Sequence, residues 1–411
     1  MLGTARRKNI GRVTEDVAES NYQGLQQFIS DSPWSHRAVM DDVARGAAQV
    51  LGGHRDTALY VDETSFVKKG TASVGVQRQY CGRLGKLENC QVGVFACLGR
   101  GERAALVDFR LFLPQEWAED AARCQRAKIP EAARRHRTKA QLALVLVQAA
   151  RERRLGHQWV GGDEIYGNHR ELTDALDALG ETFLMDVASN LKVWNHDPSP
   201  QPPPPTPLGR PATRARAQSA QARAQSVSAL ATAQFAQESR DLVLREATKG
   251  PLRARLWVRP VWLWNQRHEK AAHPRLLIVR REGDGSYKYS LSNAPADTAG
   301  ERLGWMQAQR FFIERAFQDA KSELGMAQYE VRGWRGWHHH ITLCCLALLF
   351  TLKERLAAVD HTPLLSVRDI VELLAFYLPR KTRDPDHLLA ALNARHTARE
   401  AAMQSARKRS S

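Results

Sequence analysis

The sequence lacks the features that mark a secreted or membrane-bound protein. Its six cysteines form neither a C-x2-C pair nor the spacing of a secreted disulfide framework, so we expect reduced, packed thiols and no zinc site. The first residues contain no apolar segment typical of a secretory signal, and the longest apolar run, residues 341–352, is too short to span a bilayer. We therefore expect a cytoplasmic protein with no membrane partner.

Acidic residues are scarce relative to basic ones. The 411 residues include 60 Lys and Arg against 44 Asp and Glu, which gives a formal net charge of +16. Such an excess favours a polyanionic partner, DNA or RNA before a membrane surface. Because 43% of the residues are hydrophobic, the chain can build a large core in two or three structural units, which excludes a disordered tail as its general character.

Hydrophobic periodicity predicts an α/β fold in the first half of the chain. Residues 1–54 have a helical period and form a predicted helical N-terminal unit, a candidate for DNA binding. Residues 55–190 then contain several β-rich runs followed by alternating helix and strand, the order of a ribonuclease-H-like mixed sheet with helices on both faces. The predicted strands are 57–62, 73–80, 89–98, 104–113, 157–163 and 182–187, and the predicted helices are 137–154 and 171–179.

The composition changes abruptly after residue 190, which predicts an insertion over residues 191–300. Its first part, 191–240, is rich in Pro, Arg and Ala and is expected to be a mobile basic segment, while 241–300 is β-rich. Residues 301–355 would return to the catalytic core as two helices, and 356–411 would form a helical C-terminal region with a basic tail. The strands expected in the insertion are 254–264, 275–282 and 287–294.

The helix predicted over residues 310–325 has an unusual arrangement of charge. At about 100° per residue, Arg310, Glu314 and Lys321 fall within an arc of about 40°, beside an apolar stripe. An ordinary i, i+4 ion pair on a solvated rim would explain two of these residues. The stripe consists of Phe312, Ile313, Ala316, Phe317, Ala320 and Leu324.

Acidic residues at two strand ends give this helix a possible role. Asp62 ends the predicted strand 57–62 and Asp163 ends the predicted strand 157–163, which take the places of the first and fourth strands of the ribonuclease-H-like order and would be neighbours in the sheet. Together with Glu314, they would form a carboxylate site suited to two Mg²⁺ or Mn²⁺ ions, which can catalyse phosphodiester chemistry. Each aspartate alone could be a turn or helix cap, and periodicity does not decide between these residues and the adjacent Glu63 and Glu164.

Three stretches of the sequence resemble one family. "YVDETSFVKKGTASVGVQRQYCGRLGKLENCQVGVF" surrounds Asp62, "WVGGDEIYG" contains Asp163, and "MAQYEVRGWRGWHHHITL" follows Glu314. These stretches resemble the DDE transposases of bacterial insertion sequences, in the branch of DDE superfamily endonucleases. That group has a Tyr-x2-Arg-x3-Glu-x6-Lys signature, which corresponds here to Gln307, Arg310, Glu314 and Lys321, with three of four positions matching.

The resemblance implies a DNA transposase that cuts at the terminal inverted repeats of its element and joins the freed 3′ ends to target DNA. It implies double-stranded DNA as partner, a homodimer in the DNA complex, and Asp62, Asp163 and Glu314 as catalytic metal ligands. Arg310 and Lys321 would bind DNA phosphates. Two departures stand out. Gln307 replaces the tyrosine that contacts a phosphate of the DNA end in this group, so this contact is either made by Gln307 as a donor or moved elsewhere. Glu63 stands where an Asp is expected.

Further basic and aromatic residues are candidates for DNA contact, although core packing or solvated hairpin charges would equally explain them. The tryptophans of the insertion could stack on an unpaired base, but we expect at least two of them to fill its core. The candidates are Lys68, Lys69, Arg78 and Lys86 near the first strand, Arg332, Trp334 and Arg335 after the glutamate, and Trp257, Trp262 and Trp264 in the insertion.

Two alternative functions remain open from the sequence. A ribonuclease-H-like nuclease or resolvase would cut DNA without strand transfer. A catalytically silent DNA-binding regulator would bind the ends of the element without cutting them. Both would preserve the basic character of the chain, so its charge does not separate them from a transposase.

Overall fold

The computed structural model describes residues 2–3, 7–82, 84–201, 215–245, 250–265, 269, 271–381 and 384–410. The chain divides into two compact units: His36–Gln318, and Met1–Ser35 together with Asp319–Ser411. This division differs from the predicted N-terminal unit of residues 1–54. The third helix of the chain, α3 (His36–Leu51), belongs to the larger unit because its buried face, which includes Met40 and Val43, packs on two strands of the sheet.

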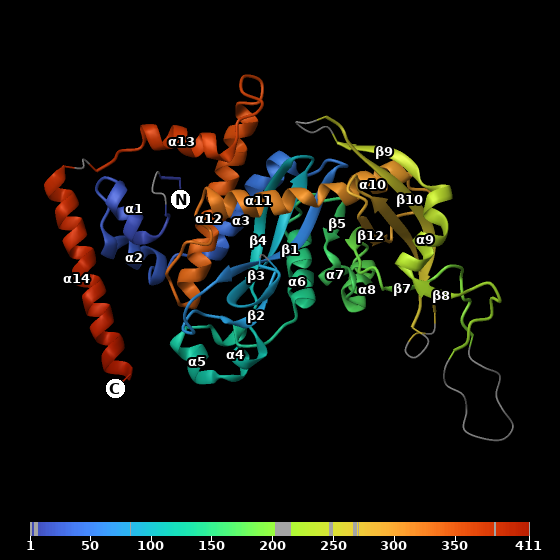
Figure 1. Cartoon of the computed structure of the whole chain (residues 1–411), viewed down its shortest axis with the longest axis horizontal. Helices are drawn as coiled ribbons and strands as arrows, with labels where there is room; N and C mark the ends of the chain where they lie inside the picture. The colour runs from blue at the N-terminus through green and yellow to red at the C-terminus, as the bar shows by residue number, and fades with distance from the viewer. Residues whose placement is uncertain are drawn as a thin grey trace. The chain divides into compact units, whose positions relative to one another are not determined.

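The larger unit is built on a twelve-stranded mixed sheet (Figure 1). The strand order is β2-β3-β1-β5-β6-β12-β11-β10-β7-β8, with β4 paired to β3 and β9 paired to β10. Strands β1, β5 and β6 are parallel to one another, and β3 and β4 continue the sheet in antiparallel pairing. The strands are β1 (Thr57–Val67), β2 (Gln77–Cys81), β3 (Lys86–Arg100), β4 (Arg103–Leu111), β5 (Trp159–Gly162), β6 (Phe183–Asp186), β7 (Lys192–Trp194), β8 (Ala224–Ser226), β9 (Arg240–Arg245), β10 (Leu252–Leu263), β11 (His273–Arg281) and β12 (Tyr287–Ser292).

Helices connect and cover these strands. The N-terminus of α6 carries a capping box in which Thr138 and Gln141 satisfy each other's backbone N–H groups. The α10 and α11 helices follow one another directly, and only Arg310 separates them. Besides α3, the helices are α4 (Gln115–Glu119), α5 (Ala121–Arg126), the 3₁₀ helix η1 (Glu131–Ala133), α6 (Lys139–Glu152), α7 (Glu164–Gly167), α8 (Arg170–Ala178), α9 (Val227–Glu238), α10 (Gly300–Gln309) and α11 (Phe311–Ser322).

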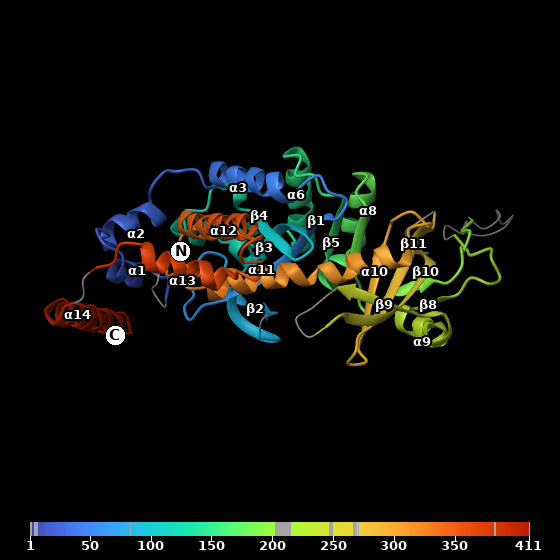
Figure 2. The ribbon, with the colours of Figure 1, turned by 90° about the horizontal axis from the view of Figure 1, so that it is seen from above.

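The α6 and α11 helices cover opposite faces of the sheet beside β1 (Figure 2). Asp62 lies directly opposite Phe95 of β3, so the two side chains share a face, and the Phe95 ring packs on Phe317 of α11 with centroids 5.2 Å apart. Glu63 points to the other face, where its carboxylate lies 2.7 Å from the ammonium of Lys139 on α6. Adjacent acids of one strand therefore enter different environments.

The predicted mobile segment, residues 191–240, is largely folded where the structure describes it. Strands β7 and β8 pair with each other, and Val227, Leu230 and Phe235 of α9 are buried in a core with Trp257 of β10. The apolar residues of α9 recur at helical spacing, a signal that the Ala- and Gln-rich composition of the segment obscured. The run of four prolines, within residues 202–214, lies outside the described residues.

The smaller unit contains α1 (Ile10–Asp16), α2 (Tyr22–Ser30), α12 (Trp334–Ala357), α13 (Val367–Tyr377) and α14 (Pro385–Ser410). The apolar run 341–352 lies in α12, whose side chains are mostly buried, as expected. In the part of the chain that the structure describes, none of the helices has both the length and the apolar character needed to cross a bilayer. The predicted C-terminal basic tail is helical over α14.

The predicted packing of several residue types is confirmed. All six cysteines are buried free thiols. The apolar stripe of α11 and its continuation to Leu324 is buried throughout. Trp257 and Trp264 of the insertion are buried, as expected for at least two of its tryptophans. The rings of His338 and His339 lie 2.8–3.0 Å from backbone carbonyl oxygens, which gives these side chains a structural role in the smaller unit.

Candidate active site

Asp62 and Asp163 occupy equivalent positions on neighbouring parallel strands. The register of β1 and β5 pairs Val61 with Gly162 as its last position, so each aspartate is the next residue along its strand. The prediction that Asp62 ends the first strand is wrong, because β1 continues to Val67 through antiparallel pairing with β3. The two aspartates nevertheless mark the edge where the parallel pairing stops, which is where functional side chains gather in sheets of this kind.

Asp163 also begins a helix. Its Oδ1 accepts a hydrogen bond of 3.0 Å from the backbone N–H of Ile165, so Asp163 is the N-cap of α7, as the simpler interpretation of a strand-end aspartate predicts. The tight strand-to-helix turn depends on glycines. A Cβ on Gly162 would lie 2.8 Å from the sulfur of Met185, and a Cβ on Gly167 would overlap the backbone carbonyl of Asp186.

The guanidinium of Arg310 is the centre of the site. Its Nη1 lies 3.7 Å from a carboxylate oxygen of Asp62 and 3.2 Å from one of Glu314, and its Nε lies 3.1 Å from Asp186. Asp62 lies in β1 where its pairing with β5 stops, Asp163 directly follows β5, Asp186 ends β6, and Glu314 lies in the first turn of α11. Asp62, Asp186 and Glu314, which are far apart in the sequence, therefore lie around the guanidinium of Arg310.

The electrostatics of the two aspartates indicate an excess of negative charge. Burial raises the pKa of Asp62 well above its usual range, and the neighbouring charge of Asp163 raises it further, while Arg310 lowers it. Burial and the charge of Glu63 raise the pKa of Asp163 to about 6, against the opposing effect of Arg310. Several carboxylates that repel one another at a half-buried edge favour a further cation.

These residues fit a divalent metal ion by the chemistry of their donors. Carboxylate oxygens are the ligands that Mg²⁺ and Mn²⁺ prefer, and the arginine already present supplies only one positive charge to several acids. Glu314 is about half exposed, with 53% of its side-chain surface accessible, so its carboxylate can be approached from solvent.

Asp186 is a functional candidate that the sequence interpretation missed. It is the last residue of β6, the next parallel strand after β5, and its carboxylate binds both Arg310 and the hydroxyl of Ser290. The signal that predicted Asp163 was an acid at the end of an apolar strand, and the stretch "TFLMDV" carries the same signal.

Gln307 does not face solvent in the structure, whereas a direct contact with a DNA phosphate would need an accessible side chain. Only 5% of its surface is exposed, and its Nε2 donates a hydrogen bond of 2.6 Å to the hydroxyl of Ser290. The α10 helix packs on β6, β9, β10 and β11, so the side of the helix that carries Gln307 turns inward. The physical reason is tertiary: a glutamine at this position satisfies a buried hydroxyl.

The other predicted DNA contacts are distributed over the two units. In the larger unit, Lys69 and Arg78 are exposed near the β1–β3 edge, while Lys68 is half-buried and Lys86 forms an ion pair of 3.6 Å with Glu88. In the smaller unit, Arg332 is exposed, the Trp334 ring packs 4.1 Å from that of His338, and Arg335 donates a hydrogen bond to the carbonyl of Asp31. Lys321 lies in the last turn of α11.

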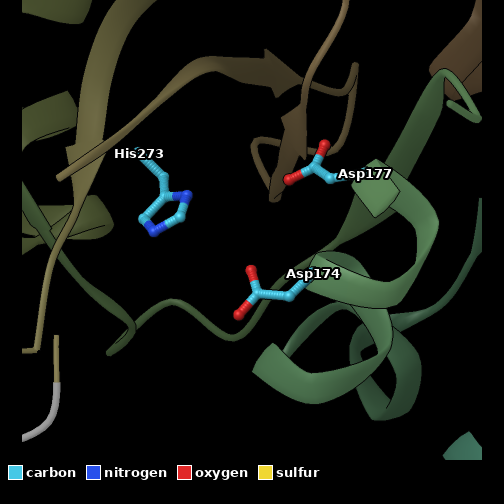
Figure 3. Close-up of side chains that lie close together, drawn as sticks. All are labelled: Asp174, Asp177 and His273. Atoms are coloured by element: carbon cyan, nitrogen blue, oxygen red, sulfur yellow. The ribbon is translucent and has the colours of Figure 1, made fainter. Parts of the chain in front are cut away.

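A second acidic cluster lies on α8 (Figure 3). Among the described residues, the ligand atoms of Asp174, Asp177 and His273 lie within 4.8 Å of one another. Arginine already compensates both carboxylates, however: Arg170 lies 2.8 Å from Asp174, and Arg275 forms an ion pair with Asp177. Each of these two carboxylates therefore has its own arginine partner, whereas Asp62, Asp186 and Glu314 share Arg310.

Comparisons with known proteins identify the family of this chain. Residues 1–251 match the family model described as DDE superfamily endonuclease, so the chain belongs to this family, as the resemblance implied. It is also 29% identical over 193 residues to the "Probable transposase for insertion sequence element IS701" of Microchaete diplosiphon. That match covers 46% of this chain and 47% of the relative, so the chain spans about half the length of the curated relative it matches.

Proposed function

We propose that this protein is the DNA transposase of an insertion sequence, with a ribonuclease-H-like core interrupted by a β-rich insertion. It would bind the terminal inverted repeats of the element, cleave phosphodiester bonds and join the 3′ ends to target DNA. The observation that carries the proposal is that the Arg310 guanidinium lies 3.7 Å from Asp62 and 3.2 Å from Glu314, while the charge of Asp163 on the neighbouring strand raises the pKa of Asp62. The strand order β4-β3-β1-β5-β6, with the last three strands parallel, supports the proposed fold.

Each part of the site has a proposed role in the reaction. The carboxylates of Asp62, Asp163 and Glu314 would hold two Mg²⁺ or Mn²⁺ ions, and such ions would supply activation of a water or 3′-hydroxyl and stabilisation of the leaving oxygen. Arg310 offers a planar fork of donors to a phosphate beside the acids. Lys321, two turns after Glu314 on α11, offers a second, point-like cation.

The remaining affinity for DNA would come from basic residues on the protein surface. Phosphate contacts supply most of the affinity of a DNA-binding protein and position the duplex, and the net charge of +16 suits that task. We assign such contacts to Lys68, Lys69 and Arg78 in the larger unit and to Arg332, Trp334 and Arg335 in the smaller one. The DNA complex would contain two copies of the chain.

The decisive experiment uses a plasmid that carries the gene with its flanking DNA, incubated with the purified protein and Mn²⁺. The unmutated protein should release ends and produce joined strands. Asp62→Asn, Asp163→Asn and Glu314→Gln should each lower the cleavage rate by at least about 10³-fold while end binding persists, because each removes a charged metal ligand. The assay is a gel that separates nicked, linear and joined products.

Each other outcome has a defined meaning. Cleavage without joined product would identify the nuclease or resolvase, and binding without any cleavage by the unmutated protein would identify the regulator. A variant of one of the three acids that cleaves at the normal rate would remove that residue from the site. Asp174→Asn is the matched control, because its carboxylate belongs to the compensated cluster on α8 and should leave the rate unchanged.

A further inference from the structure

A chain of buried hydrogen bonds leads from α10 to the centre of the site. The amide of Gln307 donates to the hydroxyl of Ser290 at 2.6 Å, and this hydroxyl donates to Asp186 Oδ1, also at 2.6 Å. The other carboxylate oxygen, Asp186 Oδ2, lies 3.1 Å from Nε of Arg310. Three separate elements, α10, β12 and β6, thus converge on one guanidinium.

The donor and acceptor roles in this series of hydrogen bonds follow from the chemistry of the three side chains. A serine hydroxyl has a single proton, and a carboxylate can only accept, so Ser290 must give its proton to Asp186 and accept from Gln307. Ser290 is fully buried and Gln307 is 5% exposed, so bulk water does not replace either bond. Buried polar groups connected in this way hold a single geometry, since each broken link leaves an unsatisfied partner.

The position of Arg310 makes such a support necessary. It lies at the junction of two helices and carries a positive charge in a site whose acids suit other cations. If another cation compensates the charges of Asp62 and Glu314, the attraction between these carboxylates and Arg310 becomes weaker. Asp186 is the partner that remains, and it fixes the guanidinium through Nε.

We propose that Asp186, Ser290 and Gln307 are positioning residues that hold Arg310 toward the scissile phosphate. The inference rests on the proposed function, and it gives the glutamine in place of the family's tyrosine a specific task. Gln307 does not contact DNA in this proposal. It orients Ser290, Ser290 orients Asp186, and Asp186 holds the guanidinium of Arg310 in position. The same series of hydrogen bonds gives a role to Asp186, the acid at the end of β6 that lies outside the expected triad.

The first test is a double-mutant cycle on the cleavage rate. Asp186→Asn keeps the shape of the side chain and removes its charge, and we expect a loss of about 10- to 100-fold, as for other residues that orient an active-site group. In a protein that already carries Arg310→Ala, the same change should cost no more than about twofold, because the group it positions is gone. Losses that multiply in the double variant would overturn the proposal.

The second test reads the pairing itself and requires no activity. The Nε–H signal of Arg310 in a ¹H–¹⁵N spectrum, assigned by its disappearance in Arg310→Lys, should move in Asp186→Asn, Ser290→Ala and Gln307→Glu. Gln307→Glu has the shape of glutamine but cannot donate when ionised, so it tests the direction of the chain. A signal that stays in place in all three variants would show that these residues do not seat the arginine.

The two tests separate this inference from the proposed function. If the unmutated protein cleaves, the triad variants do not, and Asp186→Asn cleaves normally with a normal melting temperature, only the positioning role is wrong. If the unmutated protein does not cleave at all, the proposed function fails, and the spectrum alone decides whether Asp186 seats Arg310. A melting temperature that falls in Asp186→Asn without a change in cleavage rate would indicate a merely structural role and overturn the proposal.

Discussion

Asp62 and Glu63 are neighbours on β1, yet their carboxylates meet different cations. Asp62 lies beside Arg310, whereas Glu63 binds Lys139 and accepts a hydrogen bond of 2.8 Å from the hydroxyl of Tyr166. Alternation along the strand separates them onto two faces. The departure of Glu63 from the residue expected in the family therefore falls on the side of α6 and α7.

We predict that Glu63→Gln is tolerated far better than Asp62→Asn. A glutamine still accepts the bond from Tyr166 and loses only the ion pair with Lys139, so the cleavage rate should fall by less than about tenfold, while Asp62→Asn abolishes cleavage. Rates measured on the same plasmid substrate compare the two variants. Equal losses in both would place Glu63 in the catalytic group.

Part of this arrangement could be predicted from the sequence. An acid near the end of an apolar strand is a local signal that indicated Asp62 and Asp163 as candidates, but only the family resemblance favoured them over the adjacent Glu63 and Glu164. The inward orientation of Gln307 and the ion pair between Arg310 and Asp186, which are 124 residues apart, depend on how α10 packs on β6, and no local pattern encodes that packing.

At the scale of elements, Asp108 ties the helices α3 and α6 to β4. Its side chain is 3% exposed and lies 2.6–2.7 Å from the guanidinium groups of Arg37, Arg110 and Arg153. Burial alone would raise the pKa of Asp108, but the three arginines outweigh burial and lower it well below the usual range. A carboxylate held in this way stabilises the fold only while it is ionised.

We predict that Asp108→Asn lowers the free energy of unfolding by about 3–5 kcal/mol at neutral pH, because three arginines lose a buried counter-ion. The folded pKa is depressed, so the stabilisation is present above the unfolded pKa of about 4 and is lost as the pH falls below it. The difference between the two proteins should therefore shrink on acidification. Urea unfolding at several pH values measures it.

A surface ion pair provides the control for this prediction. Asp42 and Arg45 lie 3.0 Å apart on α3, with more than two thirds of each side chain exposed. Asp42→Asn should change the free energy of unfolding by less than about 1 kcal/mol at every pH. An Asp108→Asn protein as stable as the Asp42→Asn protein would contradict the role assigned to the arginine cluster.

The approach of α7 to β6 gives a second prediction at this scale. Because a Cβ on Gly167 would overlap the backbone carbonyl of Asp186, Gly167→Ala should cost about 1–3 kcal/mol of stability and reduce cleavage as Asp186 moves. Gly70→Ala is the matched control, since a Cβ there meets nothing within 4 Å. Thermal unfolding and plasmid cleavage of both variants test the claim, which fails if they behave alike.

Elements were predicted from the sequence where their signal was strong and local. The strands around Asp62, the helix α6 and the buried stripe of α11 follow directly from apolar periodicity. The extension of β1 beyond Asp62 was missed because it depends on pairing with β3. The later part of residues 191–240 was expected to be at most a transient helix, and the stable packing of α9 was missed because a Pro- and Arg-rich neighbourhood obscured its apolar face. In both, tertiary contacts decided the outcome.

At the scale of the whole molecule, the excess of basic residues predicts a steep dependence of DNA binding on salt. Each phosphate neutralised by Lys or Arg releases counter-ions, so the logarithm of the binding constant should fall linearly with the logarithm of the salt concentration. Lys69→Ala and Arg78→Ala should each reduce that slope by about 1 if these exposed residues contact phosphates. Binding titrations of duplex DNA at several salt concentrations measure the slopes, and unchanged slopes would exclude both residues.

The pairing of β12 with β6 has a consequence for how this chain can vary. Ser290 faces Asp186 only in the observed register, although about a hundred residues separate them. A slip of β12 by one residue would turn Ser290 to the opposite face of the sheet and leave Asp186 without its donor. The segment between β6 and β12 can therefore differ in length among homologues, provided that β12 pairs with β6 in the same register.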